Sequence, residues 1–306
     1  MHARLYNEAV FALRLQPRTP LLIKAGRSGE EALDPTLPDM SFVRTNRPDR
    51  SEPEVYIPGA SLRGVLRSHA EKLLRSVSSG ERLACDPTQT GGEGGRLGKV
   101  CFAGQSNTEK IDGSEAYGKS CYACRLFGNT VLASRVRVGD LYLDPSRTPL
   151  LERRYGVAID RVTGAVAQGP FELEILTDAV FRGQLTVRNF TLGQLGLLAA
   201  ALLDLSDGLV PMGYGKSRGL GRVSVTFERV SVRTLRDPQG ALLGVGALAT
   251  DDDARAYRLP SRERERVAVD GPPASRERGF YVLSADDATA RRWLEKVANL
   301  WVEEVR

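Results

Sequence analysis

Histidine is almost missing from this chain, which has only His2 and His69 among its 306 residues. Histidine is the commonest general base at neutral pH, so a site that depends on one is hard to place here. Neither a Ser–His–Asp nor a Cys–His arrangement can be read from the sequence. Hydrolytic sites of those two kinds are therefore not expected.

The sequence also lacks a long apolar run. The longest, residues 192–205, contains two glycines, Gln194 and Asp204 and is too short to span a bilayer, so it predicts a buried helix. No N-terminal segment combines a basic region, an apolar stretch and a small-residue cleavage site. We therefore expect a cytoplasmic protein with no membrane contact.

Cysteine is scarce as well, but the spacing of the four cysteines is informative. Cys121 and Cys124 form a CxxC motif, with which two thiolates can meet one tetrahedral zinc ion. Cys85 and Cys101 lie upstream in a polar, glycine-rich insertion, and in a reducing compartment thiols more often hold a metal than form disulfides. We expect the four sulfurs to bind a structural Zn²⁺, with His69 as an alternative to one of them. A redox role is less favoured, because the residues after the CxxC do not open a thioredoxin-like helix.

What the chain has in excess is positive charge. It contains 43 basic and 38 acidic residues, with a net charge of +5 and a pI near 9.1, and most of the basic residues are arginine. This excess is compatible with a nucleic-acid partner, and arginine suits bidentate phosphate contacts and stacking on bases. The apolar content of 42% is ordinary for a soluble globular protein, and the length allows one elaborated domain or two small ones.

The most informative segment is a glycine-rich basic loop, residues 213–222, with the sequence GYGKSRGLGR. Glycine permits positive φ and close backbone approach to a ligand, and successive N–H groups can form an anion site to which Lys216 and Arg218 add full charge. A nucleotide-binding P-loop is excluded, because its first glycine position is Val210 and the chain continues into strand-like residues 222–228. The loop predicts contact with a polyanion.

Alternating and helical apolar patterns predict an α+β protein. Its order of elements is that of an elaborated ferredoxin-like (RRM-like) βαββαβ core. Strands are expected at 9–15, 134–143, 180–190 and 222–228, a β-hairpin at 155–175, and helices at 61–74, capped by Ser61, and 192–205, capped by Thr191.

Two regions follow from this pattern. Residues 1–232 would form a palm, with the cysteine-bearing insertion at about 78–124 and a thumb hairpin at about 152–175. Residues 233–306 would form a C-terminal extension, with a charged linker at 250–279 and a final amphipathic helix capped by Ser284.

One irregular loop, residues 33–39, carries paired carboxylates. Asp34 and Asp39 could approach a Mg²⁺ ion there. Acidic residues in a polar loop are usually only solvated, so the loop by itself assigns no chemistry.

Four ordered motifs together resemble the RAMP superfamily, and most closely the backbone subunit of type III CRISPR–Cas effector complexes. They are YIPGASLRG at 56–64, CRLFG at 124–128, GVAIDRVTGA at 156–165 and the glycine-rich loop at 213–221. The resemblance implies subunits stacked along a CRISPR guide RNA, with the palm and glycine loops holding the guide backbone. Each thumb would wedge between guide and target and flip target nucleotides.

The same resemblance implies site residues. In that family an aspartate before the YIPG segment cleaves target RNA with Mg²⁺ or another divalent ion, and Asp39, followed by Val43-Arg44, is the best match. Arg44, Arg47 or Arg50 would neutralise the phosphate. The partners would be guide RNA, target RNA, other effector subunits and copies of this chain. The implied RNA-binding positions are Ser61, Arg63, Arg67, Arg161, Gly213, Tyr214, Gly215, Lys216, Ser217, Arg218 and Gly219.

Two departures from the family pattern keep other functions open. Thr45 stands where the family commonly has a second acidic residue, and the loop at 46–54 is longer. The alternative is therefore a non-catalytic subunit that binds guide RNA or caps the filament. A stand-alone endoribonuclease that processes precursor RNA is a third possibility, but it is disfavoured by the shortage of histidine.

Overall fold

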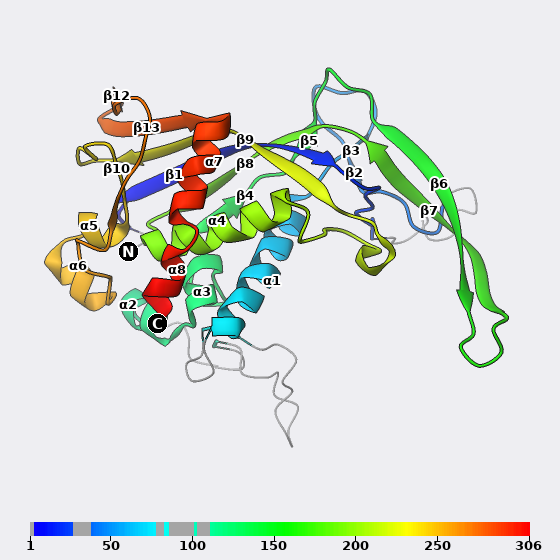
Figure 1. Cartoon of the computed structure of the whole chain (residues 1–306), viewed down its shortest axis with the longest axis horizontal. Coiled ribbons are helices and arrows are strands. Elements are labelled where there is room, and N and C mark those ends of the chain that lie inside the picture. The colour runs from blue at the N-terminus through cyan, green and yellow to red at the C-terminus, as the bar shows by residue number, and fades with distance from the viewer. Residues whose placement is uncertain (1–2, 27–37, 78–82, 86–100, 103–110) are drawn as a thin grey trace.

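Helices cover one face of an antiparallel sheet in the computed structural model, which describes residues 3–26, 38–77, 83–85, 101–102 and 111–306 (Figure 1). Among those residues the sheet has seven strands in the order β12-β13-β9-β1-β8-β4, with β5 also paired to β8. The predicted mixed α+β class is confirmed. The strands are β1 (Asn7–Pro17), β4 (Val136–Val138), β5 (Tyr142–Leu143), β8 (Phe181–Arg188), β9 (Val223–Thr234), β12 (Ser275–Glu277) and β13 (Phe280–Asp286).

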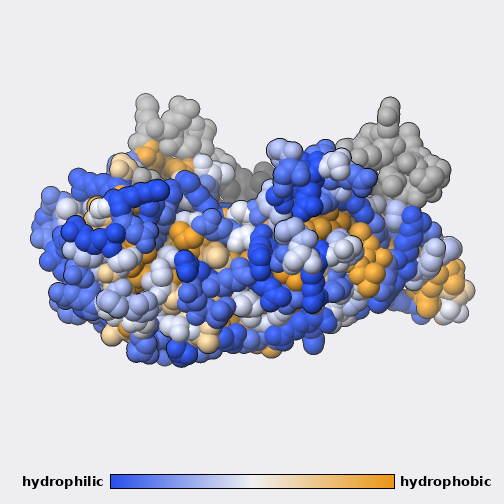
Figure 2. All heavy atoms as spheres, turned by 90° about the horizontal axis from the view of Figure 1, so that it is seen from above, coloured by the Kyte–Doolittle hydropathy of each residue, from blue (hydrophilic) through white to orange (hydrophobic). Residues whose placement is uncertain are grey.

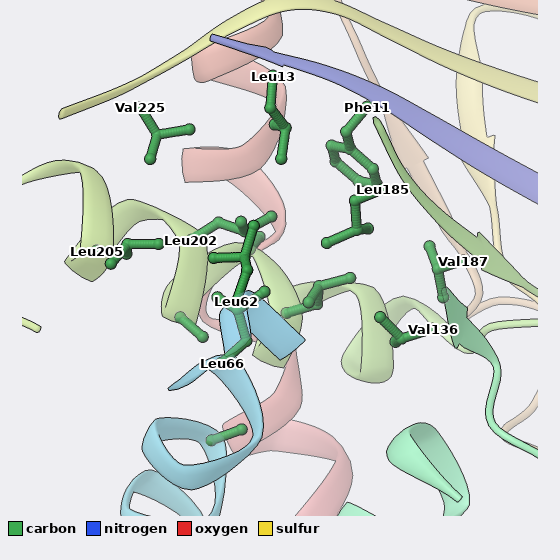
Figure 3. Packing of buried hydrophobic residues seen from close by; sticks show 14 of the residues in the cluster. Phe11, Leu13, Leu62, Leu66, Val136, Leu185, Val187, Leu202, Leu205 and Val225 are labelled. Atoms are coloured by element: carbon green, nitrogen blue, oxygen red, sulfur yellow. The ribbon is translucent and has the colours of Figure 1, made fainter. Parts of the chain in front are cut away.

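The core lies between this sheet and the helices (Figure 3). Phe11 and Leu13 of β1 point toward Leu62 and Leu202 of the helices, and each of the four is at most 1% exposed. Burying one such side chain stabilises the fold by roughly 1.5–3 kcal/mol. The helices are α1 (Gly59–Val77), α4 (Leu192–Ser206), α7 (Asp287–Val297) and α8 (Leu300–Val305).

Helix α4 begins as the sequence predicts. The Thr191 hydroxyl accepts a hydrogen bond from the Gln194 N–H (3.1 Å), and the Gln194 side-chain oxygen accepts one from the Thr191 N–H (3.3 Å). This capping box satisfies two of the N–H groups that a helix start leaves without partners. The predicted cap by Thr191 is confirmed.

Helix α1 begins two residues earlier than predicted, so the expected cap by Ser61 is wrong. Ser61 lies in the first turn and donates its N–H to the Pro58 carbonyl (2.9 Å). The N–H of Gly59 is instead accepted by the Asp140 carboxylate (2.7 Å). A Cβ at position 59 would clash with the Val138 carbonyl oxygen, which belongs to the rigid backbone of β4. Only glycine lets the helix start so close to the sheet edge.

The strand predicted at 134–143 is interrupted where it meets the segment that leads into α1. β4 ends at Val138 and β5 begins at Tyr142. Between them Leu141 exchanges two backbone hydrogen bonds with Ile57, both 2.9 Å. The chain leaves the sheet here and holds the segment that leads into α1.

A β-hairpin extends away from the helix-covered part of the molecule (Figure 1). It consists of β6 (Leu150–Ile159) and β7 (Val166–Asp178), so the hairpin predicted around residues 155–175 is confirmed and is longer. The Asp160 carboxylate accepts hydrogen bonds from the N–H groups of Val162 (3.0 Å) and Thr163 (2.7 Å), which fixes the turn.

The C-terminal segment is more structured than expected. The predicted linker at 250–279 contains a helix and two strands, and Ser284 lies in β13, opposite Ser231 of β9, rather than at a helix cap. The final helix is divided into α7 and α8. The remaining elements are β2 (Arg44–Thr45), β3 (Glu54–Val55), α2 (Gly113–Lys119), α3 (Tyr122–Phe127), η3 (Lys216–Arg218), β10 (Ala241–Leu243), α5 (Val245–Leu248), α6 (Asp251–Ala256) and β11 (Arg266–Ala268).

Gly59→Ala is expected to lower the free energy of unfolding by about 1–3 kcal/mol, because the added methyl group meets rigid backbone of the sheet. Gly64→Ala, in the middle of the same helix, is the control. A Cβ at position 64 meets nothing within 4 Å, and alanine favours a helix by about 1 kcal/mol over glycine. Urea unfolding of both variants measures the difference, and equal stabilities would contradict the close approach.

Candidate nucleic-acid interface and metal centre

Residues 18–25, here called the anchor segment, follow β1 and form backbone hydrogen bonds with three distant parts of the chain. These parts are the glycine-rich loop, the loop that carries Asp39, and β7 at the base of the hairpin. Their convergence on one segment brings three of the predicted motifs side by side. The bonds are Tyr214 N–H to Leu22 O (2.7 Å), Val43 N–H to Ile23 O (2.9 Å), and Leu21 N–H to Leu176 O with its reciprocal (both 2.8 Å).

Glycine is required in the glycine-rich loop for steric reasons. Gly213 has a φ of +81°, and a Cβ there would clash with the Leu22 carbonyl oxygen of the anchor segment. Gly221 has a φ of +89°, and its Cβ would clash with the Met212 carbonyl oxygen. Without a side chain at Gly213 the loop can close on the anchor segment, and without one at Gly221 its two ends can approach each other.

The same loop presents its charges to solvent. Lys216, Ser217, Arg218 and Gly219 are all exposed, and the first three form the short helix η3. The Arg218 guanidinium lies 5.0 Å from the centre of the Tyr214 ring. Within the described part of the chain, neither Lys216 nor Arg218 forms an ion pair, so both charges are available to an anionic ligand.

Asp39 lies exposed beside the base of the hairpin, whereas Asp34 is outside the described residues. One carboxylate oxygen of Asp39 accepts a hydrogen bond from the Glu172 N–H of β7 (2.7 Å). The next residue, Met40, pairs with Leu173 in a parallel bridge. The position of this carboxylate is thus set by the backbone of β7.

The three arginines expected to neutralise a phosphate near Asp39 are each engaged with a carboxylate. Arg44 forms a bidentate pair with Glu174, with distances of 2.7 and 2.9 Å. Arg47 and Arg50 both pair with Glu54, at 3.0 and 3.7 Å. Their charges are therefore largely balanced within the protein.

Apolar side chains gather on the hairpin and are unusually exposed. Val162 at the turn is 93% exposed, Tyr155 66% and Ile159 63%. Figure 2 shows hydrophobic surface at the end of the molecule that carries the hairpin. Arg161 is exposed in the same turn. A contiguous exposed apolar surface of this kind is typical of an interaction site.

Arg63 and Arg67, two of the predicted RNA-binding positions, both connect α1 to the end of α3. Arg63 donates to the carbonyl of Phe127, and Arg67 donates to the carbonyl of Gly128 (3.0 Å). Arg67 also donates to the sulfur of Cys124 (3.4 Å). In this structure both guanidinium groups serve internal contacts, and their role toward RNA stays a prediction.

The four cysteines converge on one buried point. The Cys85 sulfur lies 3.4 Å from that of Cys101, 3.5 Å from that of Cys121 and 3.6 Å from that of Cys124, and all four sulfurs lie within 4.8 Å of one another. Four sulfurs around a tetrahedral zinc ion are separated by about 3.8 Å, because each Zn–S bond is about 2.3 Å. The cluster therefore fits a metal ion such as zinc.

His69 does not take part in this cluster, so the alternative in which it replaces a cysteine is wrong. Its Nε2 lies 2.6 Å from the Asp204 carboxylate of α4. Hydrogen bonds within the cluster lower the pKa of the Cys101 thiol and raise the pKa of the Cys121 and Cys124 thiols, so Cys101 is the thiol that ionises most readily. A stable thiolate is the form that binds a metal.

Two contacts at the site were missed by the sequence analysis. Asp140 supports the start of α1, and its only signal is its place after a strand and a glycine. The Glu174 carboxylate accepts hydrogen bonds from Arg44 and from the Phe42 N–H, both at 2.9 Å. The alternating pattern of the strand around Glu174 gives no indication of this role. Both contacts join residues that are far apart in the sequence.

These features define a class of antiparallel α+β protein. Its members have an exposed basic glycine loop, a projecting hairpin and a four-cysteine centre. The RAMP superfamily model matches residues 14–224, more than half of the chain, and the chain therefore belongs to this superfamily. The superfamily is associated with CRISPR-related RNA-binding proteins, which function in ribonucleoprotein complexes. The search of curated proteins found no match. Within the described residues, none of the helices has the length and apolar character needed to cross a membrane.

Cys121→Ser is expected to abolish metal binding, because it removes one of the four sulfurs of the cluster. Metal analysis of the purified protein should fall from about one ion per chain to near zero, and thermal unfolding should begin at a lower temperature. His69→Gln is the matched control and should retain the metal. Loss of the metal from the His69 variant, or its retention in the Cys121 variant, would contradict the four-cysteine assignment.

Proposed function

We propose that this chain is a guide-RNA-binding backbone subunit of a type III CRISPR effector complex and cleaves target RNA with a divalent metal ion. The observation that carries the proposal is the anchor segment, which gathers the glycine-rich loop, the Asp39 loop and the hairpin base. These are the three elements that would hold the guide, cut the target and separate the two strands. Their close association supports one RNA-binding face.

The sheet order supports a ferredoxin-like palm for this face. Strands β1, β4, β8 and β9, with α1 after β1 and α4 after β8, follow the βαββαβ order along the chain. In the sheet these strands lie in the order β9-β1-β8-β4. A structural Zn²⁺ held by Cys85, Cys101, Cys121 and Cys124 would then fix the insertion onto α1 of this palm.

Binding of the guide would depend on phosphate contacts. Lys216 and Arg218 are exposed on η3, and the neighbouring backbone can approach a ligand closely. Contacts of this kind carry no sequence information, so the target sequence would be selected by pairing with the guide. Other effector subunits and further copies of this chain would be partners along the same RNA.

Cleavage would use the exposed carboxylate of Asp39. A flipped target nucleotide can align its 2′-OH for attack on the adjacent phosphorus, which would form a 2′,3′-cyclic phosphate as the P–O5′ bond breaks and the 5′-oxygen leaves as a hydroxyl. The proton of the 2′-OH would pass to Asp39 or to solvent, and Mg²⁺ or a similar ion would stabilise the charge that develops. An aspartate is a weak base, so correct geometry and the metal would supply most of the acceleration. The hydrogen bond from the Glu172 N–H supports such fixed geometry.

One observation favours the alternative of a non-catalytic guide-binding or filament-capping subunit. Arg44, Arg47 and Arg50 all pair with glutamates, so none offers a free charge to the phosphate beside Asp39. Thr45 also stands where a second carboxylate would help to hold a metal. The two functions share the same RNA-binding face and differ only in cleavage.

Asp39→Ala in the assembled complex separates these two functions. We expect the wild-type complex to cut guide-complementary RNA at regular intervals when Mg²⁺ is present, and the variant to cut it more slowly by about two orders of magnitude or more. Asp252→Ala, which removes an exposed carboxylate on α6, serves as the control and should cut normally. Absence of cutting by the wild type, with target binding intact, would establish the non-catalytic alternative.

Lys216→Ala combined with Arg218→Ala is expected to weaken guide-RNA binding. Loss of two phosphate contacts should also make the plot of log affinity against log salt concentration shallower by roughly 1.5. Arg255→Ala, on α6, removes an exposed arginine elsewhere and should leave both quantities unchanged. Fluorescence anisotropy at several salt concentrations provides the measurement. An unaltered slope in the double variant would argue against phosphate contact by this loop.

A further inference from the structure

The side chain of Glu174 fastens the hairpin to the residues that follow Asp39. It lies on β7, and both of its carboxylate oxygens are used. One accepts from Arg44 Nη2 (2.7 Å), and the other accepts from Arg44 Nη1 and from the Phe42 N–H, both at 2.9 Å. Three donors from the loop after Asp39 thus meet one carboxylate on the hairpin.

This contact is partly shielded from water. The Glu174 side chain is 15% exposed and that of Arg44 35%. Burial alone would raise the pKa of Glu174, but the hydrogen bonds from Arg44 and the Phe42 N–H outweigh it, so the pKa lies below that of an ordinary glutamate. A bidentate arginine–carboxylate pair in such surroundings has a defined geometry as well as a favourable energy.

The contact also reinforces the register that main-chain hydrogen bonds set between the two segments. Main-chain bonds run from the Met40 N–H to the Glu172 carbonyl (3.1 Å) and from the Glu174 N–H to the Met40 carbonyl (2.9 Å). The same stretch of β7 supplies the N–H that holds the Asp39 carboxylate. A slip of one residue along β7 would break the Glu174 contacts and turn the supporting N–H away from Asp39.

We propose that Glu174 is the positioning residue for Asp39, and that it couples the placement of the hairpin to that carboxylate. The proposal rests on the proposed cleavage function, because it concerns the geometry of the same site. Glu174 does not touch the RNA in this role. Arg44 acts as its partner within the protein and not as a ligand of the phosphate.

Glu174→Gln tests the proposal in the assembled complex with guide RNA. Glutamine keeps the size of the side chain but loses the charge that holds Arg44 and one of the two acceptor oxygens. Single-turnover cleavage of complementary RNA should slow by about 10- to 100-fold, since small displacements of a catalytic group have effects of that size. The dissociation constant for target RNA should change by less than twofold. Glu152→Gln, which removes an exposed carboxylate from the neighbouring strand β6, should cleave at the wild-type rate.

The exchanged pair Arg44→Glu with Glu174→Arg distinguishes positioning from a general loss of structure. It restores the ion pair with the charges exchanged. It should therefore cleave target RNA faster than Arg44→Glu alone or Glu174→Arg alone. A Glu174→Gln complex that cleaves at the wild-type rate, or an exchanged pair no faster than the single variants, would overturn the proposal.

Failure of the proposed function itself gives a different result. In that case the wild-type complex would bind target RNA without cutting it, and the proposal would be judged by hydrogen exchange. Faster exchange of the Phe42 amide in Glu174→Gln than in wild type would support the fastening of the loop to the hairpin. Unchanged exchange would overturn it.

Discussion

The backbone hydrogen bonds of the anchor segment are the constraint on which the rest of the site depends. Residues 18–25 continue directly from the central strand β1, so their position is fixed by the core of the sheet. Segments with few hydrogen bonds and few buried contacts open easily, and the anchor segment supplies both kinds of contact. By binding to this segment, the two loops and β7 acquire a common frame, which the buried side chains of Leu22, Phe42 and Met212 tie to the hydrophobic core.

The cysteine centre has a similar role on the helix side of the molecule. Two of its sulfurs come from a CxxC at the start of α3, and Arg67 of α1 donates to Cys124. Arg63 and Arg67 then reach the carbonyls that end α3. A bound metal would therefore stiffen α1 as well as the insertion, and α1 begins at the motif that meets the sheet edge.

The parts that could be predicted from the sequence are those determined by local chemistry. The capping box of α4, the hairpin turn around Asp160 and the glycine-rich loop each depend on residues close together in the chain, and all three elements are present. The predicted cap by Ser61 and the predicted helix start at Ser284 are wrong, because tertiary contacts determine where α1 begins and place Ser284 in a strand. Arg44 and Glu174 are 130 positions apart, and no local pattern indicates their pairing.

The anchor segment also has a consequence for the order of folding. The Arg222 N–H reaches the Thr19 hydroxyl across 203 positions of sequence, and β1 pairs with strands that come late in the chain. Contacts over such separations form slowly, because the loop-closure entropy is lost before they are made. We therefore expect the glycine-rich loop to reach its final shape only after the sheet has closed. Partly folded chains would lack the proposed RNA-binding surface, so under the proposed function RNA would select completely folded subunits during assembly.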